Sequence, residues 1–187
     1  INVVVFIASF LLPQLNNIFA AYYPFSPNFK SWQIITHMFM HGNFMHILFN
    51  MFTLFSFGPI LEQSLGDKKY LILYFLSGLG AFFLFNLWNF VEVQQITAGL
   101  QSLGLNPSEI YTKADINYNG NLNISATTQE GKDLSQQIYF ALRIRIVGAS
   151  GVIFGVIAAF VTLYPDAKIG IMFIPVPVKA KYIIPVY

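Results

Sequence analysis

The chain has 187 residues, of which 56% are hydrophobic and only 10% are charged. Since roughly a quarter of the residues in a soluble domain are charged, this composition excludes an ordinary soluble protein and indicates a membrane protein. The formal net charge of +2 comes without a basic block, so we expect no nucleic-acid partner. The absence of cysteine from the chain excludes a disulfide, a thiolate metal site and a cysteine nucleophile.

Three of the gaps between charged residues are each long enough for a helix of roughly 20 residues to cross the bilayer. They lie between Lys30 and Glu62, between Lys69 and Glu92, and between Arg145 and Asp166. We therefore predict an all-α polytopic membrane protein, an integral protein that crosses the lipid bilayer several times.

The first half of the chain contains two predicted spans joined by a long connection. Residues 1–12 form the end of a first spanning helix, which Pro13 stops. The connection, residues 13–43, is rich in aromatic side chains, which concentrate at the headgroup level of a membrane. The second span covers residues 44–61, and a charged turn at 62–69 follows it.

The second half begins with a third predicted span at residues 70–91. Residues 92–146 are polar and lose the apolar periodicity of a span, so we expect an insert outside the membrane, with a short amphipathic helix at about 134–142. A fourth span covers residues 147–164, and residues 180–187 begin a fifth. The chain is thus expected to be a membrane domain cut at both ends.

The distribution of lysine and arginine predicts the orientation of these spans. The connections 62–69 and 165–181 hold five basic residues in about 25 positions, whereas 13–43 and 92–146 hold five in about 85. Because cytoplasmic connections are enriched in basic residues, the first pair is predicted to be cytoplasmic. The second span and the fourth span then both start at the outer side of the membrane.

Ser150 is the first candidate for chemistry, because it lies in a Gly-Ala-Ser-Gly motif at the start of the fourth span. Glycines at Gly148 and Gly151 leave space around its hydroxyl, and the N-terminus of a helix favours a developing oxyanion. The alternative is packing: Gly151, Gly155 and Ala159 form a stripe of small residues that lets helices approach closely. The two interpretations are compatible, but the packing stripe does not require a serine.

His46 and Asn50 form a second candidate site near the outer end of the second span, at the depth predicted for Ser150. Their spacing of four residues places both on one face of a helix. Polar side chains inside a membrane can simply cross-link helices by hydrogen bonds. Both can also donate a hydrogen bond to an oxyanion, a role in which one donor contributes about 3–4 kcal/mol to transition-state stabilisation.

His37 and His41 lie shortly before this pair and raise the alternative of a metal site, since imidazole is a common ligand. No Asp or Glu between Lys30 and Glu62 could supply an anionic ligand or orient a histidine. We therefore predict no metal, and expect these two histidines to fix the connection to the second span or to shape the entrance of the site.

Several motifs together resemble the rhomboid intramembrane serine proteases. The resemblance rests on Trp32, Thr36, His37, His41 and the run Met45 to Asn50, on Glu62, Leu65, Gly66, Tyr74 and Gly78, and on Gly148 to Gly151. It covers most of the chain outside the insert at 92–146. It implies a rhomboid-like bundle with a six-helix core.

The resemblance also implies the chemistry of the site. Ser150 would be the nucleophile of a Ser–His dyad, and the oxyanion hole would combine its backbone N–H with the side chains of His46 and Asn50. The substrates would be transmembrane segments of other proteins, cleaved without metal or cofactor. The expected location is the bacterial inner membrane.

Three features depart from the family pattern. The usual Trp-Arg pair is Trp32-Gln33 here, so an arginine that anchors the connection is lost. The insert at 92–146 is much longer than the family minimum. The family's general-base histidine belongs to the sixth helix, which we expect to lie beyond this chain.

Two other functions remain possible from the sequence. A rhomboid-like pseudoprotease would bind transmembrane segments without cleaving them, and it gains weight if no sixth helix exists. A histidine-lined metal-binding or transport protein would instead use His37, His41 and His46 as ligands. Sequence beyond the chain and metal analysis of the purified protein distinguish these alternatives.

Overall fold

A computed structural model describes residues 1–120, 126–169 and 178–182 of the chain. The described residues are mostly helical and form two compact units. The first unit combines Ile1–Met40 with Phe82–Val147, and the second combines His41–Ala81 with Gly148–Tyr187. One long helix, α5 (Asp67–Ser102), contributes its start to the second unit and its end to the first.

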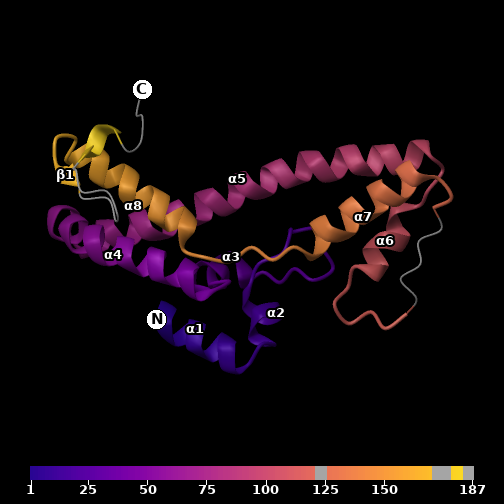
Figure 1. The fold of residues 1–187 in the computed structure, drawn as a ribbon, viewed down its shortest axis with the longest axis horizontal. Helices are drawn as coiled ribbons and strands as arrows, with labels where there is room; N and C mark the ends of the chain where they lie inside the picture. Colours follow the sequence, from indigo (N-terminus) through magenta and orange to yellow (C-terminus); the bar gives the residue numbers. More distant parts are fainter. Residues whose placement is uncertain (121–125, 170–177, 183–187) are drawn as a thin grey trace. The chain divides into compact units, whose positions relative to one another are not determined.

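The second unit is built around two parallel helices, α4 (Phe44–Leu65) and α8 (Ser150–Leu163), which pack side by side (Figure 1). Their shared direction follows from three contacts. Gly148 lies against His46 where the helices start, the rings of Phe57 and Phe160 are 4.7 Å apart in the middle, and Ser64 bonds Tyr164 at the far ends. The starts of the two helices are therefore neighbours.

The start of α5 packs against α8 along a stripe of small residues. A side chain on Gly151 would overlap the methyl group of Ala81, and one on Gly155 would overlap Ser77. The stripe predicted at Gly151 and Gly155 is thus confirmed as a packing surface that brings two helices close together.

Within the described residues, two helices, α4 and α5, are long and apolar enough to cross a membrane, while α1 (Asn2–Leu11) and α8 are shorter apolar helices. With 36 residues, α5 is about 54 Å long, well beyond the ~30 Å hydrocarbon core of a bilayer. The third predicted span ended at residue 91, but the helix continues to Ser102. Its last turns bury Val93, Ile96 and Leu100 on one face.

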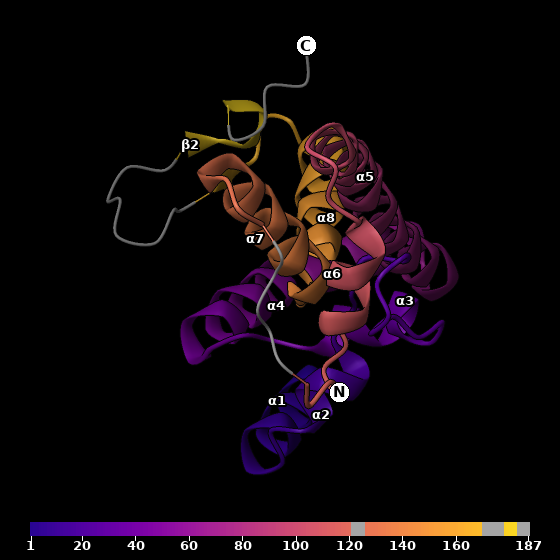
Figure 2. The same ribbon diagram turned by 90° about the vertical axis from the view of Figure 1, so that its right-hand side faces the viewer.

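The first unit has a core made by the end of α5 together with α6 (Pro107–Lys113) and α7 (Gln129–Arg143). Figure 2 shows α6 and α7 beside each other, and they are in contact. The cluster of buried residues comprises Tyr23, Val93, Ile96, Leu100, Ile110, Ala114, Ile138 and Leu142. The amphipathic helix predicted at about 134–142 is confirmed as part of α7. Tyr23 shows that the connection at 13–43 shares this core.

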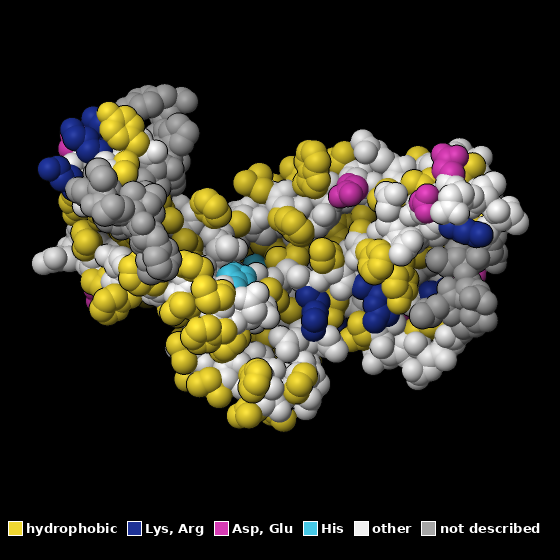
Figure 3. Space-filling model, viewed as in Figure 1, with side chains coloured by type: hydrophobic (Ala, Val, Ile, Leu, Met, Phe, Trp, Pro, Cys, Tyr) yellow, Lys and Arg dark blue, Asp and Glu magenta, His cyan; other side chains and the backbone are white. Residues whose placement is uncertain are grey.

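That connection folds into α2 (Leu15–Phe19), α3 (Gln33–Thr36) and the 3₁₀ helix η1 (His37–Phe39). Helix α1 precedes it and contacts both α2 and η1. Much of α1 stays exposed, including 71% of Val4 and 78% of Phe10, and Figure 3 shows hydrophobic side chains over this helix. Such an apolar surface suits lipid better than water.

Hydrogen bonds tie the connection to the insert. The Ser26 hydroxyl donates to Leu142 O at 2.6 Å, and Asn28 Nδ2 donates to Ala114 O at 2.8 Å. The Ile116 N–H donates to Asn28 Oδ1 at 2.8 Å. Ala21 and Ile146 also exchange backbone hydrogen bonds. The insert at 92–146 is therefore folded against the connection.

The all-α prediction needs one correction, because residues after α8 form a small antiparallel pair, β1 (Lys168–Ile169) and β2 (Val178–Lys179), followed by the 3₁₀ helix η2 (Ala180–Tyr182). The Asp166 carboxylate accepts hydrogen bonds from Lys179 at 3.1 Å and Lys181 at 3.0 Å, which closes this turn. These lysines hold the pKa of Asp166 below its usual value. Most of the fifth span predicted at 180–187 lies outside the described residues.

Candidate active site

Ser150 is the first residue of α8, and its side chain is exposed. The fourth span was predicted to begin at residue 147, but the helix starts three residues later, at the serine itself. Gly148 and Ala149 precede it as buried residues of a loop. Because the first turn of a helix has N–H groups without intrahelical acceptors, Ser150 belongs to the part of α8 whose backbone donors are free to bind an anion.

Gly148 brings the backbone of this loop against the ring of His46. Its φ angle is +115°, a conformation that side chains disfavour, and a Cβ there would lie 2.6 Å from Cε1 and 2.7 Å from Nε2 of His46. Only glycine fits under these two constraints. The structure therefore brings the predicted nucleophile motif and the predicted oxyanion donor together.

The start of α4 positions His46. Asn43 caps this helix, since its Oδ1 accepts the His46 N–H at 2.8 Å. The cap fixes the first turn, so the half-buried imidazole projects from a defined position.

Asn50 lies one turn further along α4 and is only 6% exposed. Its Nδ2 has no hydrogen-bond partner among the residues that the structure describes. A buried carboxamide without a partner loses about 1–3 kcal/mol, so an external acceptor would be favourable. Such a donor is suited to an oxyanion that forms during a reaction.

The other two histidines are placed differently. The His41 ring lies 5.2 Å from that of His46, centroid to centroid, at 68°. His37 lies in the first unit, where its Nδ1 is 2.8 Å from Gln33 O and its ring packs 5.1 Å from Phe82 of α5. Burial lowers the pKa of His37, which favours the neutral ring. These contacts are with α3 and α5, and the predicted attachment to the second span, or a role at the entrance of the site, stays a prediction.

A metal cluster does not form in the described ranges, where no three His, Asp or Glu side chains come together. The three residues predicted to carry the chemistry are Ser150, His46 and Asn50, and all of them belong to the second unit.

Trp32 and Gln33 anchor the connection within the first unit. Trp32 Nε1 donates to Ile18 O at 2.9 Å. The side chain of Gln33 is fully buried; its Nε2 donates to Ile18 O at 3.3 Å and its Oε1 accepts the Lys30 N–H at 3.0 Å. Both polar groups of the Gln33 side chain thus have hydrogen-bond partners at this buried position.

Three residues with positional roles were missed from the sequence. Asn43 could have been found, because asparagine just before an apolar run is a common helix N-cap. Ser26 and Asn28 bond to residues about a hundred positions away, and no local pattern signals such contacts.

Comparison with known proteins identifies a Rhomboid domain at residues 28–104. Rhomboid-like protease 3 of Toxoplasma gondii is 37% identical over 60 residues, which are 32% of this chain and 23% of that protein. Rhomboid protease GlpG of Salmonella paratyphi A is 37% identical over 79 residues, 41% of this chain and 29% of the relative. The domain match includes His46 and Asn50 and ends before Ser150.

The chain thus matches less than a third of the length of these curated relatives. No solved structure matches it. The relatives named here are proteases, and proteins of the rhomboid family are integral to membranes.

Proposed function

Because residues 28–104 match the Rhomboid domain, we propose that this chain belongs to the rhomboid family and is part of an intramembrane serine endopeptidase. Its substrates are transmembrane segments of other membrane proteins, which are cleaved within the bilayer. The proposed location is the bacterial inner membrane, with several helices crossing it.

The proximity of Gly148 to His46 carries this proposal. Through this contact, the loop that precedes Ser150 lies against helix α4. The same helix carries the buried Asn50, whose Nδ2 has no hydrogen-bond partner among the described residues. In the proposed reaction the Ser150 hydroxyl attacks the scissile carbonyl carbon. The carbonyl oxygen then becomes an oxyanion, which accepts hydrogen bonds from the Ser150 N–H, His46 and Asn50.

A base must take the proton of Ser150 when it attacks. We assign His46 to the oxyanion, and the His37 ring contacts Gln33 and Phe82. From the resemblance to the rhomboid family, we place the base on a histidine of a core helix outside these 187 residues, which completes a Ser–His dyad. That histidine later protonates the leaving amine.

The test uses the full-length protein, reconstituted with a single-span substrate. Ser150→Ala is expected to abolish cleavage while the thermal midpoint stays near that of the parent protein. Ser56→Ala is the matched control, because the hydroxyl of this α4 serine donates to Phe52 O one turn back, so its loss should leave cleavage intact. Cleavage that persists in Ser150→Ala contradicts the proposal. Binding of the substrate without any cleavage by the parent protein would identify a pseudoprotease instead.

A further inference from the structure

A cavity of about 190 Å³ lies in the first unit, and none of its lining residues belongs to the proposed protease site. One wall comes from the connection at 13–43 and the other from the insert at 92–146. Six of the lining residues carry the argument: Asn17, Asn28, Lys30, Trp32, Asp115 and Asn117. Since a water molecule occupies about 30 Å³ in the liquid, the cavity has room for a small polar group.

Hydrogen bonds hold the walls of this cavity in place. The carboxamide of the buried Asn28 joins the two walls through Ala114 O and the Ile116 N–H, both at 2.8 Å. Asp115 is oriented by Asn117, whose backbone N–H donates to Oδ1 at 2.8 Å and whose Nδ2 donates at 3.2 Å. The cavity is therefore preorganised rather than a gap between mobile side chains.

The two walls present opposite charges. Lys30 stands on the connection and Asp115 on the insert, and neither is in an ion pair within the part of the chain that the structure describes. Two guanidinium groups border the same region: Arg145 donates to Asn17 Oδ1 and Arg143 to Asp115 O, each at 3.3 Å. The surroundings thus offer the Lys30 ammonium and two nearby guanidinium groups to an anion, and the Asp115 carboxylate to a cation.

The aromatic side chain indicates where this cavity lies. Trp32 is 49% exposed although its Nε1–H is bonded to Ile18 O, so the ring itself remains available at the cavity. Exposed tryptophan in a membrane protein concentrates at the headgroup level. The available ligand with both charges at that level is a zwitterionic phospholipid.

We propose that this cavity binds the phosphoethanolamine headgroup of a membrane phospholipid. Its phosphate accepts hydrogen bonds from the Lys30 ammonium, and its primary ammonium donates to the Asp115 carboxylate. A choline headgroup fits less well, because its quaternary ammonium has no N–H to donate and a single indole does not form an aromatic cage. The inference rests on the membrane location of the protein and is independent of proteolysis.

Lipid retention measures this preference directly. The full-length protein is reconstituted in nanodiscs with equal parts of phosphatidylethanolamine, phosphatidylcholine and phosphatidylglycerol, released into detergent, and analysed by native mass spectrometry. Phosphatidylethanolamine is expected to be retained about tenfold over both other lipids, in line with one charge-assisted hydrogen bond. Equal retention of the three lipids, or more phosphatidylglycerol than phosphatidylethanolamine, contradicts the proposal.

Conservative substitutions test whether Asp115 binds the ammonium of the headgroup and Lys30 binds its phosphate. Asp115→Asn keeps the oxygen that accepts from Asn117, so the wall stays folded, yet it should lose the preference for ethanolamine over choline. Lys30→Gln should lower retention of both zwitterionic lipids, and Lys30→Arg should restore it. Lys132→Gln is the matched control, because this exposed lysine of α7 lies outside the cavity. The proposal fails if the control loses the preference too, or if the Asp115 and Lys30 variants retain it.

A competition experiment with a soluble headgroup distinguishes a bound lipid from a free metabolite. Free phosphoethanolamine should displace the retained lipid only at concentrations far above those at which the lipid binds, since it lacks the acyl chains. Displacement at equal concentration would identify a soluble ligand and overturn the lipid assignment. The protease assay is unaffected by either result, so failure of this inference does not affect the proposed function.

Discussion

At the scale of single residues, Gly148 links the nucleophile motif to the proposed oxyanion donor. Two separate constraints act on it, a φ angle of +115° and the His46 ring where a Cβ would be. The φ angle raises the free energy of the folded protein by roughly 1–2 kcal/mol when a residue other than glycine occupies this position. The second constraint, the close contact, forces the His46 ring to move when a Cβ is added. Only the second should affect catalysis, so the two can be separated by experiment.

Gly148→Ala is expected to lower kcat about a hundredfold or more, since a displaced His46 no longer serves as an oxyanion donor. Gly66→Ala is the matched control, because Gly66 has a φ of +79° in the same unit and nothing within 4 Å of its Cβ position. The control should lower the thermal midpoint slightly and leave kcat unchanged. Equal activity of the two variants would show that the His46 contact has no catalytic role.

The unpartnered amide of Asn50 leads to a second prediction. Asn50→Ala removes a donor that no described residue uses, so stability should change little while kcat/KM falls about a hundredfold, or roughly 3 kcal/mol. Asn86→Ala is its counterpart: this asparagine of α5 is equally buried but donates to Phe82 O at 2.8 Å. It should lower stability and spare catalysis. A purely structural role for Asn50 predicts the reverse, and thermal unfolding beside a cleavage assay distinguishes them.

At the scale of elements, the sequence predicted the apolar helices well because their signal is local. Charge-free stretches located α4, α5 and α8, and glycine spacing located the stripe that packs against α5. The end of α5 was missed because polar residues on its exposed face conceal the buried row of Val93, Ile96 and Leu100. That row packs against α6 and α7, which are separate in sequence.

The hydrogen bonds of Asn28, which link the connection to the insert, lead to a prediction about the stability of the first unit. Asn28→Ala leaves Ala114 O and the Ile116 N–H without their partner, and should lower the stability of the first unit by about 2–4 kcal/mol. Hydrogen exchange at residues 20–30 and 107–116 should rise together. Asn119→Ala serves as the control, since this side chain is exposed, and it should change neither quantity. Exchange that rises on only one side would show that the two segments are not held by this carboxamide.

At the scale of the whole molecule, the resemblance seen in the sequence agrees with the Rhomboid domain match at residues 28–104. The structure places Gly148 beside His46 in the second unit, while the catalytic roles of Ser150 and His46 stay predictions. The sequence did not predict the two-unit division. The contacts of Ser26 and Asn28 in the first unit depend on the fold of the insert, which has no membrane pattern to reveal it. From the sequence we expected Gln33 to cost the connection an anchor, because its bonds to Ile18 and Lys30 have no local signal.

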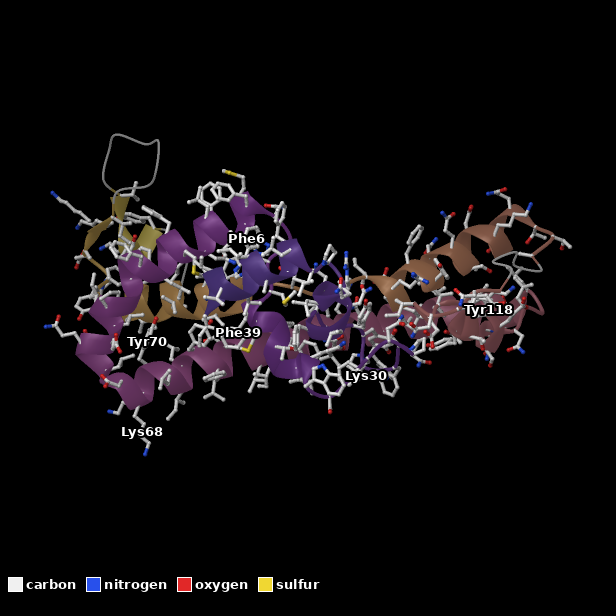
Figure 4. All side chains as sticks on the ribbon, turned by 90° about the horizontal axis from the view of Figure 1, so that it is seen from below. Phe6, Lys30, Phe39, Lys68, Tyr70 and Tyr118 are labelled. Atoms are coloured by element: carbon white, nitrogen blue, oxygen red, sulfur yellow. The ribbon has the colours of Figure 1, made fainter. Side chains whose placement is uncertain are left out.

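The orientation of the molecule can be tested because the chain contains no cysteine. The distribution of basic residues predicts that the α4–α5 turn is cytoplasmic and the insert is outside, with α5 crossing between them. Lys68 points away from the helices into the surroundings (Figure 4), and Glu130 is exposed on α7, so neither substitution should disturb packing. In spheroplasts, a membrane-impermeant maleimide should label Glu130→Cys directly and Lys68→Cys only after permeabilisation. Labelling of both before permeabilisation would place both ends of α5 on one side. The opposite pattern would invert the orientation, and Ser150 would then face the cytoplasmic side.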